Sequence, residues 1–246
     1  MMANRIGEAS ARLEARIAGG LWLVVLVAGT AAWLLRAPLI VRRDAAATAA
    51  NVLASEPSFR LGFAADLIGG ACYLGVTVIL YGLLKPLNRS LSLLAAAFGV
   101  VGVAVGAAIS LNSLAPLNQL GTGQPLAAFS TGQLQAQALL SLRLYEQGFS
   151  IGMVFFGFQC ISIGWLIARS TFLPRILGWF LAIGGSSYVI SSFASFLSPA
   201  LGARLSPWIL PTALVGEGSL CLWLLLKGVN VPRWEESAGR GLTQAS

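Results

Sequence analysis

Histidine is absent from this chain of 246 residues, and cysteine is scarce. The absence of histidine excludes histidine-ligated zinc, bis-histidine haem and a serine–histidine dyad. The three cysteines, Cys72, Cys160 and Cys221, each lie in an apolar run, so we interpret them as small apolar packing residues and not as a disulfide framework. The sequence therefore predicts no metal site, no cofactor and no catalytic residue, and it favours a protein that is not an enzyme.

Charged residues are also scarce: they make up 10% of the chain, while 57% of the residues are hydrophobic and the mean hydropathy is +0.79. Soluble domains carry roughly 25% charged residues, so this chain cannot cover itself with a solvated surface. We therefore predict an all-α, polytopic integral membrane protein whose partner is the lipid bilayer. The net charge of +7 does not indicate nucleic acid as a partner, because the basic residues stand singly at the expected helix ends, near lipid headgroups.

The apolar runs predict six transmembrane helices. They cover residues 17–35, 59–84, 91–111, 148–168, 176–197 and 208–226. On this basis we expect an N-terminal segment over residues 1–16, a transmembrane domain over residues 17–229 and a flexible tail over residues 230–246.

Two further helical features are expected on the outer side. Asp44 is a good N-cap for the alanine-rich stretch that follows it, which predicts a short surface helix in the first outer loop. The fourth helix begins at the capping-box pair Ser130 and Gln133, and it is too long for the bilayer. Glu146 lies ~33 Å along the axis from Ala168, whereas the hydrocarbon core is ~30 Å thick. We therefore expect the first turns of this helix at or beyond the outer boundary.

The polar segments between the later spans are expected to be loops. Residues 112–130, which include Pro116, form the predicted second outer loop, and residues 198–206 form the third. Ser206 followed by Pro207 is typical of an N-cap and a first helical residue, so we expect the sixth helix to begin there.

The basic residues predict the orientation of the chain. Six spans place both termini on one side, and that side holds ten Lys and Arg residues against five on the other, which indicates cytoplasmic termini. The ten are Arg5, Arg12, Arg16, Lys85, Arg89, Arg169, Arg175, Lys227, Arg233 and Arg240, and the five are Arg36, Arg42, Arg43, Arg60 and Arg204. Tryptophans that fall near the expected boundaries, as interfacial anchors do, are Trp22, Trp165, Trp179, Trp208 and Trp223.

Several stretches carry a family resemblance. They include DAAATAANVLASEPSFRLGFAADL at residues 44–67, LRLYEQGFSIGMVFFGFQC at residues 142–160 and STFLPRILGWFLAIGGSSYVISSF at residues 170–193. Over roughly residues 15–229 the chain resembles the bacterial membrane proteins catalogued as domain of unknown function 4386. The resemblance implies a six-helix protein of the bacterial inner membrane, and it implies no activity.

Charged residues within the apolar runs are the candidate site, because charge at membrane depth is costly and needs partners. Asp66 and Glu217 lie ~10 Å and ~14 Å from the outer ends of their predicted helices. Arg143 and Glu146 share one helix face at spacing i, i+3. We expect these four residues, joined by Asn112, to form an outward-facing polar cavity.

Two functions are compatible with such a cavity. The first is binding or transport of a small cationic or amphipathic ligand, or of a proton, because three acids outnumber one arginine. The second is a non-catalytic scaffold or partner subunit in which the charges fix helix register. A third interpretation of Asp66 and Glu217 is that they are protonated. An intramembrane hydrolase that uses Ser191 or Ser192 with Glu217 is a weaker alternative. The sequence leaves the substrate, the oligomeric state and the direction of any transport open.

Overall fold

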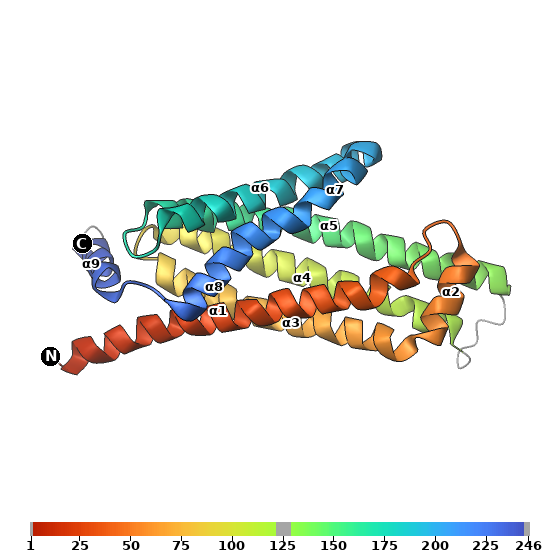
Figure 1. Ribbon diagram of the computed structural model, residues 1–246, viewed down its shortest axis with the longest axis horizontal. Coiled ribbons are helices and arrows are strands. Elements are labelled where there is room, and N and C mark those ends of the chain that lie inside the picture. The colour runs from red at the N-terminus through yellow and green to blue at the C-terminus, as the bar shows by residue number, and fades with distance from the viewer. Residues whose placement is uncertain (1, 122–128, 244–246) are drawn as a thin grey trace. The chain divides into compact units, whose positions relative to one another are not determined.

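The computed structural model describes residues 2–121 and 129–243, and these residues form helices and connecting turns without a β-strand. Figure 1 labels the main elements. They are α1 (Met2–Arg36), the 3₁₀ turn η1 (Ala37–Leu39), α2 (Ala45–Ala54), α3 (Glu56–Leu84), α4 (Arg89–Leu120), α5 (Thr131–Arg169), α6 (Arg175–Leu197), α7 (Pro199–Ala213), the π-helical turn η2 (Leu214–Gly218), α8 (Ser219–Leu226) and α9 (Val231–Thr243). The predicted all-α class is confirmed.

The chain divides into two compact units. Unit 1 comprises Met1–Val24, Cys72–Val103 and Gly152–Ser246, and unit 2 comprises Val25–Ala71 and Ala104–Ile151. Helices α6 to α9 therefore belong to unit 1, and η1 and α2 belong to unit 2. The long helices α1, α3, α4 and α5 each contribute residues to both units.

Within residues 2–121 and 129–243, five helical segments are long and apolar enough to cross a membrane. Their apolar surface is largely uncovered: the most apolar window of α4 has a mean hydropathy of 2.2, yet only 17% of that window is buried. An exposed surface of this kind is unfavourable in water and is typical of a membrane protein. The five segments are Ala11–Leu39, Glu56–Leu84, Arg89–Leu120, Thr131–Arg169 and Arg175–Leu197.

The predicted sixth span, residues 208–226, belongs to a longer bent region, Pro199–Leu226. Its two parts, Pro199–Ile209 and Pro211–Leu226, meet at an angle of 42°. The prediction that a helix begins at Ser206 and Pro207 is wrong, because α7 already begins at Pro199 and holds Pro207 in its interior. Proline removes a backbone hydrogen bond and so bends a helix, but it need not end one.

The loop expected over residues 198–206 is replaced by a tight turn from α6 into α7. These two helices lie side by side in unit 1 (Figure 1). Gly202 permits the close approach, since a Cβ atom at this position would stand 2.6 Å from the Cα atom of Ser195. A side chain here would force the helices apart, so the packing of glycine against serine explains why no loop is needed.

Helix α4 is also longer than the sequence indicated. It continues to Leu120, so the prediction that Asn112 and Pro116 lie in an outer loop is wrong. Leu117 packs in a hydrophobic cluster with Phe59, and Leu114 packs against the same cluster. This apolar contact on both sides of Pro116 stabilises the extra turns. Within the expected loop, residues 122–128 lie outside the described residues.

Both ends of the chain are helical, although we expected residues 230–246 to form a flexible tail. Helix α1 begins at Met2, so the expected N-terminal segment and the first span form one continuous helix. Helix α9 occupies most of the expected tail. Its Trp234 Nε1 donates a hydrogen bond of 2.9 Å to the Leu83 carbonyl, and Val231 is buried. These contacts dock α9 on unit 1.

The short helix α2 and the long helix α5 form as predicted. Asp44 accepts a hydrogen bond of 2.8 Å from the Ala47 amide and so caps α2. Ser130 and Gln133 form reciprocal backbone-to-side-chain bonds at the start of α5. Helix α5 has 39 residues, which exceeds the ~20 that a bilayer requires.

Candidate functional site

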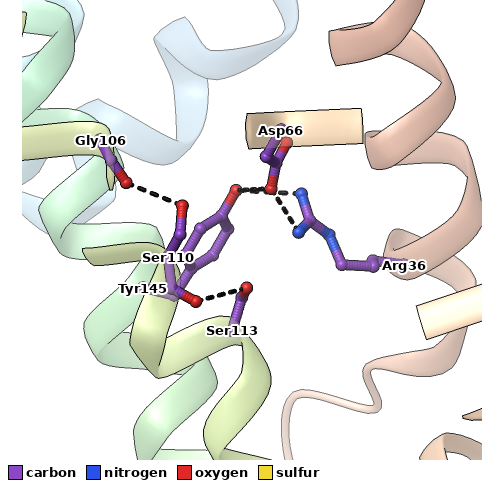
Figure 2. Close-up of polar contacts among 6 residues, drawn as sticks. All are labelled: Arg36, Asp66, Gly106, Ser110, Ser113 and Tyr145. Atoms are coloured by element: carbon purple, nitrogen blue, oxygen red, sulfur yellow. Dashed lines mark hydrogen bonds and ion pairs between the residues drawn. The ribbon is translucent and has the colours of Figure 1, made fainter. Parts of the chain in front are cut away.

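Asp66 pairs with an arginine that the sequence had assigned to the outer loop. Arg36 Nη1 lies 2.5 Å from Asp66 Oδ2, and Arg36 Nη2 donates to Tyr145 Oη over 2.9 Å. Tyr145 Oη in turn donates to Asp66 Oδ2 over 3.0 Å. Figure 2 shows the three side chains, from α1, α5 and α3, pointing toward one another. We call Arg36, Asp66 and Tyr145 the Arg36 cluster.

The Arg36 cluster is closed and electrically neutral. The Arg36 and Asp66 side chains are only 9% and 17% exposed, and each charge neutralises the other. The guanidinium carbon also lies 4.9 Å from the Tyr145 ring centroid, in a cation–π contact. Gly62 makes room for the arginine, because a Cβ atom there would lie 3.3 Å from Arg36 Cγ. This arrangement fits a pair that fixes helix register.

Arg143 and Glu146 line a pocket of about 250 Å³ in unit 2. Leu142 and Ile40 belong both to the pocket lining and to the hydrophobic cluster of unit 2, so they give the pocket an apolar floor. The charged residues on its rim are exposed. The lining consists of Ile40, Arg42, Leu139, Leu142, Arg143, Glu146 and Gln147, and we call this the Arg143 pocket.

One wall of the Arg143 pocket is the segment between η1 and α2, which side chains of α2 hold in place. Thr48 Oγ1 accepts a hydrogen bond of 2.9 Å from the Val41 amide, and Asn51 Nδ2 donates to the Leu39 carbonyl over 3.3 Å. Arg143 Nη2 donates to the Arg42 carbonyl over 2.8 Å, which ties α5 to the same segment. Hydrogen bonds from two helices therefore hold this wall of the pocket.

The Arg143 pocket holds more positive than negative charge. Glu146 Oε1 lies 3.3 Å from Arg42 Nη2, but the two side chains are 43% and 79% exposed, so this ion pair is weak. Arg143 takes part in none of the ion pairs Arg36–Asp66, Arg42–Glu146 and Arg60–Glu56. The excess of acid that we expected in the cavity is not found in this pocket.

The predicted site residues therefore fall into different environments. Arg143 and Glu146 line the pocket, and Asp66 belongs to the Arg36 cluster. Asn112 is a half-buried residue of α4 and does not line the pocket, and Glu217 belongs to unit 1. The sequence reasoning missed Arg36, Tyr145 and Arg42. A usable signal existed for Arg36, because it directly follows an apolar run at an expected membrane boundary.

Glu217 is 5% exposed and lies in the π-helical turn η2 of unit 1. Trp22 Nε1 donates to Glu217 Oε2 over 3.1 Å, and Tyr188 Oη donates to Glu217 Oε1. Both donors are neutral, so the carboxyl group is held by hydrogen bonds and not by an ion pair. We call these residues the Glu217 cluster. Such π-helical turns occur frequently at functional sites.

Aromatic side chains pack beside the Glu217 cluster. The Tyr73 ring centroid lies 6.2 Å from that of Trp22 and 4.9 Å from that of Phe156, and Phe156 stands 5.5 Å from Tyr188. Trp22 is fully buried, so the prediction that it is an interfacial anchor is wrong. Its indole nitrogen donates a hydrogen bond to the Glu217 carboxyl group instead. This part of unit 1 is a filled core.

The arrangement does not support the serine hydrolase interpretation. The two carboxyl oxygens of Glu217 accept hydrogen bonds from Trp22 and Tyr188. A general base for Ser191 or Ser192 would have to contact the serine hydroxyl instead. Among the described residues, the Glu217 carboxyl group makes no such contact with either serine.

Comparison with known proteins supplies a family but no activity. A family model described as "Domain of unknown function (DUF4386)" matches residues 17–228, which confirms the resemblance noted in the sequence. A protein of Archaeoglobus fulgidus, described as "Uncharacterized protein", is 26% identical over 153 residues, which cover 62% of this chain and 75% of that protein. No solved structure matches the chain.

Proposed function

The chain belongs to the DUF4386 family, and we propose that it binds a small amphipathic ligand in the Arg143 pocket. The family description names no activity, so the proposal is based on the site. The observation that carries it is the pocket itself, which combines an apolar floor with exposed charged side chains in about 250 Å³. Ligand sites typically pair such an apolar lining with a few placed polar groups.

The proposal includes a membrane topology. We propose six spans, of which the bent region Pro199–Leu226 is the last, in the inner membrane of a bacterium with both termini in the cytoplasm. The excess of basic residues on the terminal side supports this orientation. In this topology Arg143 and Glu146 lie near the outer boundary, so a ligand reaches the pocket from the outer leaflet or the outer aqueous phase.

The size of the pocket limits the part of a ligand that it encloses. Typical small-molecule sites occupy about 300–1,000 Å³, so a volume of about 250 Å³ fits a headgroup and the first carbons of a chain. The remaining carbons can lie along an exposed apolar residue of the same helix, Leu140. An amphipathic molecule can therefore place its headgroup in the pocket and its chain on the apolar surface of α5.

Native mass spectrometry of the gently solubilised full chain tests this proposal. We expect the wild type to retain a specific bound molecule and Gln147→Trp, which fills the pocket, to lose it. Leu144→Trp is the matched control, because Leu144 is an exposed residue of α5 that does not line the pocket. A wild type that carries no adduct, or an adduct that all three proteins share, would contradict the proposal.

A second candidate is a non-catalytic scaffold or partner subunit. The closed, neutral Arg36 cluster favours it, because every charge in that cluster already has a partner and none is directed at a ligand. In this case the wild type is free of small molecules after purification and is recovered by crosslinking in cells with one defined partner protein. A wild type that is crosslinked to no protein would contradict this alternative.

A further inference from the structure

We infer that the ligand of the Arg143 pocket carries an anionic head, a phosphate or carboxylate group, on an apolar chain. The inference rests on the proposed function and names the chemistry of the ligand. It departs from the cationic ligand that the sequence favoured, because the charges that line the pocket have the opposite balance.

The first argument is that, among the described residues, Arg143 has unused hydrogen-bond donors and an unpaired charge. A guanidinium group has five N–H donors, and Arg143 uses a donor of Nη2 on the Arg42 carbonyl. Within the part of the chain that the structure describes, Arg143 forms no ion pair with a carboxylate. Its remaining donors and its charge suit a phosphate or carboxylate, which guanidinium groups bind through two parallel hydrogen bonds.

The second argument is the weakness of the Arg42–Glu146 pair. The two side chains are 3.3 Å apart and largely exposed, so an incoming anion can replace Glu146 as the partner of Arg42. Two arginines and one glutamate give the lining a charge of +1. A carboxylate head of charge −1 brings this charge to zero and a phosphate head reverses its sign, whereas a cationic head would raise it to +2, so electrostatics favour the anion.

The third argument is the apolar floor. Leu142 is 2% exposed and Leu139 is 9% exposed, and both line the pocket beside Ile40. A free inorganic anion makes no use of these side chains, whereas an acyl or alkyl chain removes apolar surface from water against them. The lining therefore favours an anion with a chain over an anion alone.

A series of octyl compounds tests the inference on the full chain in nanodiscs of phosphatidylcholine. The probes are octyl phosphate, octanoate, octyltrimethylammonium, octyl glucoside and inorganic phosphate, and the readout is the dissociation constant. We expect octyl phosphate and octanoate to bind at least tenfold more tightly than the other three. Raising the salt concentration should weaken the binding of the two anions, because the rim charges are exposed.

Substitutions on the rim test directly which charges of the pocket contact the ligand. Arg143→Gln and Arg42→Gln should each weaken octyl phosphate binding by about tenfold, the effect of one charge-assisted hydrogen bond, and leave octyl glucoside unchanged. Glu146→Gln should strengthen octyl phosphate binding several-fold, because it removes a competing anion from the rim. Arg60→Gln is the matched control, since Arg60 is an exposed arginine of unit 2 outside the pocket.

The outcomes separate the inference from the proposed function. The inference of an anionic head would be overturned if octyltrimethylammonium bound most tightly, or if Glu146→Gln weakened the binding of octyl phosphate. In either case the pocket would remain a ligand site. Failure of all five probes to bind would overturn both. Phosphatidylglycerol in the nanodiscs identifies the source: competition with octyl phosphate indicates a lipid headgroup, and undiminished binding indicates a free amphipath, and either result supports the anionic head.

Discussion

Two acids that look alike in the sequence are held in different ways in the two units. Asp66 and Glu217 each interrupt an apolar run, but the Asp66 side chain in α3 is 17% exposed, whereas Glu217 in η2 is buried. Asp66 forms an ion pair with Arg36, whereas Glu217 accepts hydrogen bonds only from the neutral donors Trp22 and Tyr188. An acid within an apolar run can therefore be stabilised either by an opposite charge or by hydrogen bonds alone. Removing the partner should lower the unfolding free energy by a different amount in the two cases.

The largest effect is expected from Arg36→Met. This change leaves the half-buried Asp66 carboxylate without its cation, and a buried charge that loses its partner costs about 3–5 kcal/mol of unfolding free energy. Denaturant titration in detergent micelles measures this cost. The double variant Arg36→Met/Asp66→Leu should recover most of this loss, because no unpaired charge remains. A loss of less than about 1 kcal/mol in Arg36→Met alone would contradict the view that the ion pair stabilises Asp66.

The next effect is expected from Glu217→Leu. It leaves the Trp22 and Tyr188 donors without an acceptor, and an unsatisfied buried donor costs about 1–3 kcal/mol. Part of this loss is offset because Leu, unlike the carboxyl group, has no desolvation cost. Glu217→Gln retains a carbonyl oxygen as acceptor and should cost less than Glu217→Leu in the same titration. Equal losses for these two substitutions would show that the hydrogen bonds do not stabilise this cluster.

Two glycines of α4 extend the comparison to packing. A Cβ atom at Gly99, in unit 1, would meet the buried Gln159 amide at 2.5 Å, so Gly99→Ala should destabilise the protein by about 1–3 kcal/mol. No atom lies within 4 Å of the corresponding position at Gly106, in unit 2, among the described residues. Gly106→Ala should therefore stabilise the helix by about 0.5–1 kcal/mol. The two substitutions should change the unfolding free energy in opposite directions.

The smallest effect on stability is expected at the rim of the pocket. Arg143→Gln and Arg42→Gln affect exposed side chains, so each should change the unfolding free energy by less than about 0.5 kcal/mol. The same variants should weaken octyl phosphate binding by about tenfold, which separates these arginines from Arg36. A loss of stability as large as that of Arg36→Met would assign the rim arginines a structural role.

The sequence was sufficient for the helical class and for features that depend on local contacts. The Asp44 cap and the Ser130–Gln133 capping box involve residues three apart, and both form as predicted. The length of α5 follows from its uninterrupted run of helix-compatible residues. These features require no knowledge of the other helices.

The partners of the buried acids could not be derived in the same way. Arg36 and Tyr145 are 30 and 79 positions from Asp66 in the chain, so their contacts depend on how α1, α3 and α5 pack. Trp22 and Tyr188 reach Glu217 across 195 and 29 positions. Composition and spacing do not specify helix rotation, and for this reason the prediction of one cavity with excess acid did not identify the pocket with excess arginine.

Photoaffinity labelling tests the central claim, that the Arg143 pocket binds an amphipathic ligand, most directly. The full chain in nanodiscs is irradiated with octyl phosphate that carries a diazirine on its chain, and the labelled peptides are mapped by mass spectrometry. We predict labels on the peptides that contain Ile40 and Leu139–Gln147, and their loss in Gln147→Trp but not in Leu144→Trp. Labels that spread over the exposed apolar faces of the helices, and that Gln147→Trp leaves unchanged, would contradict the claim.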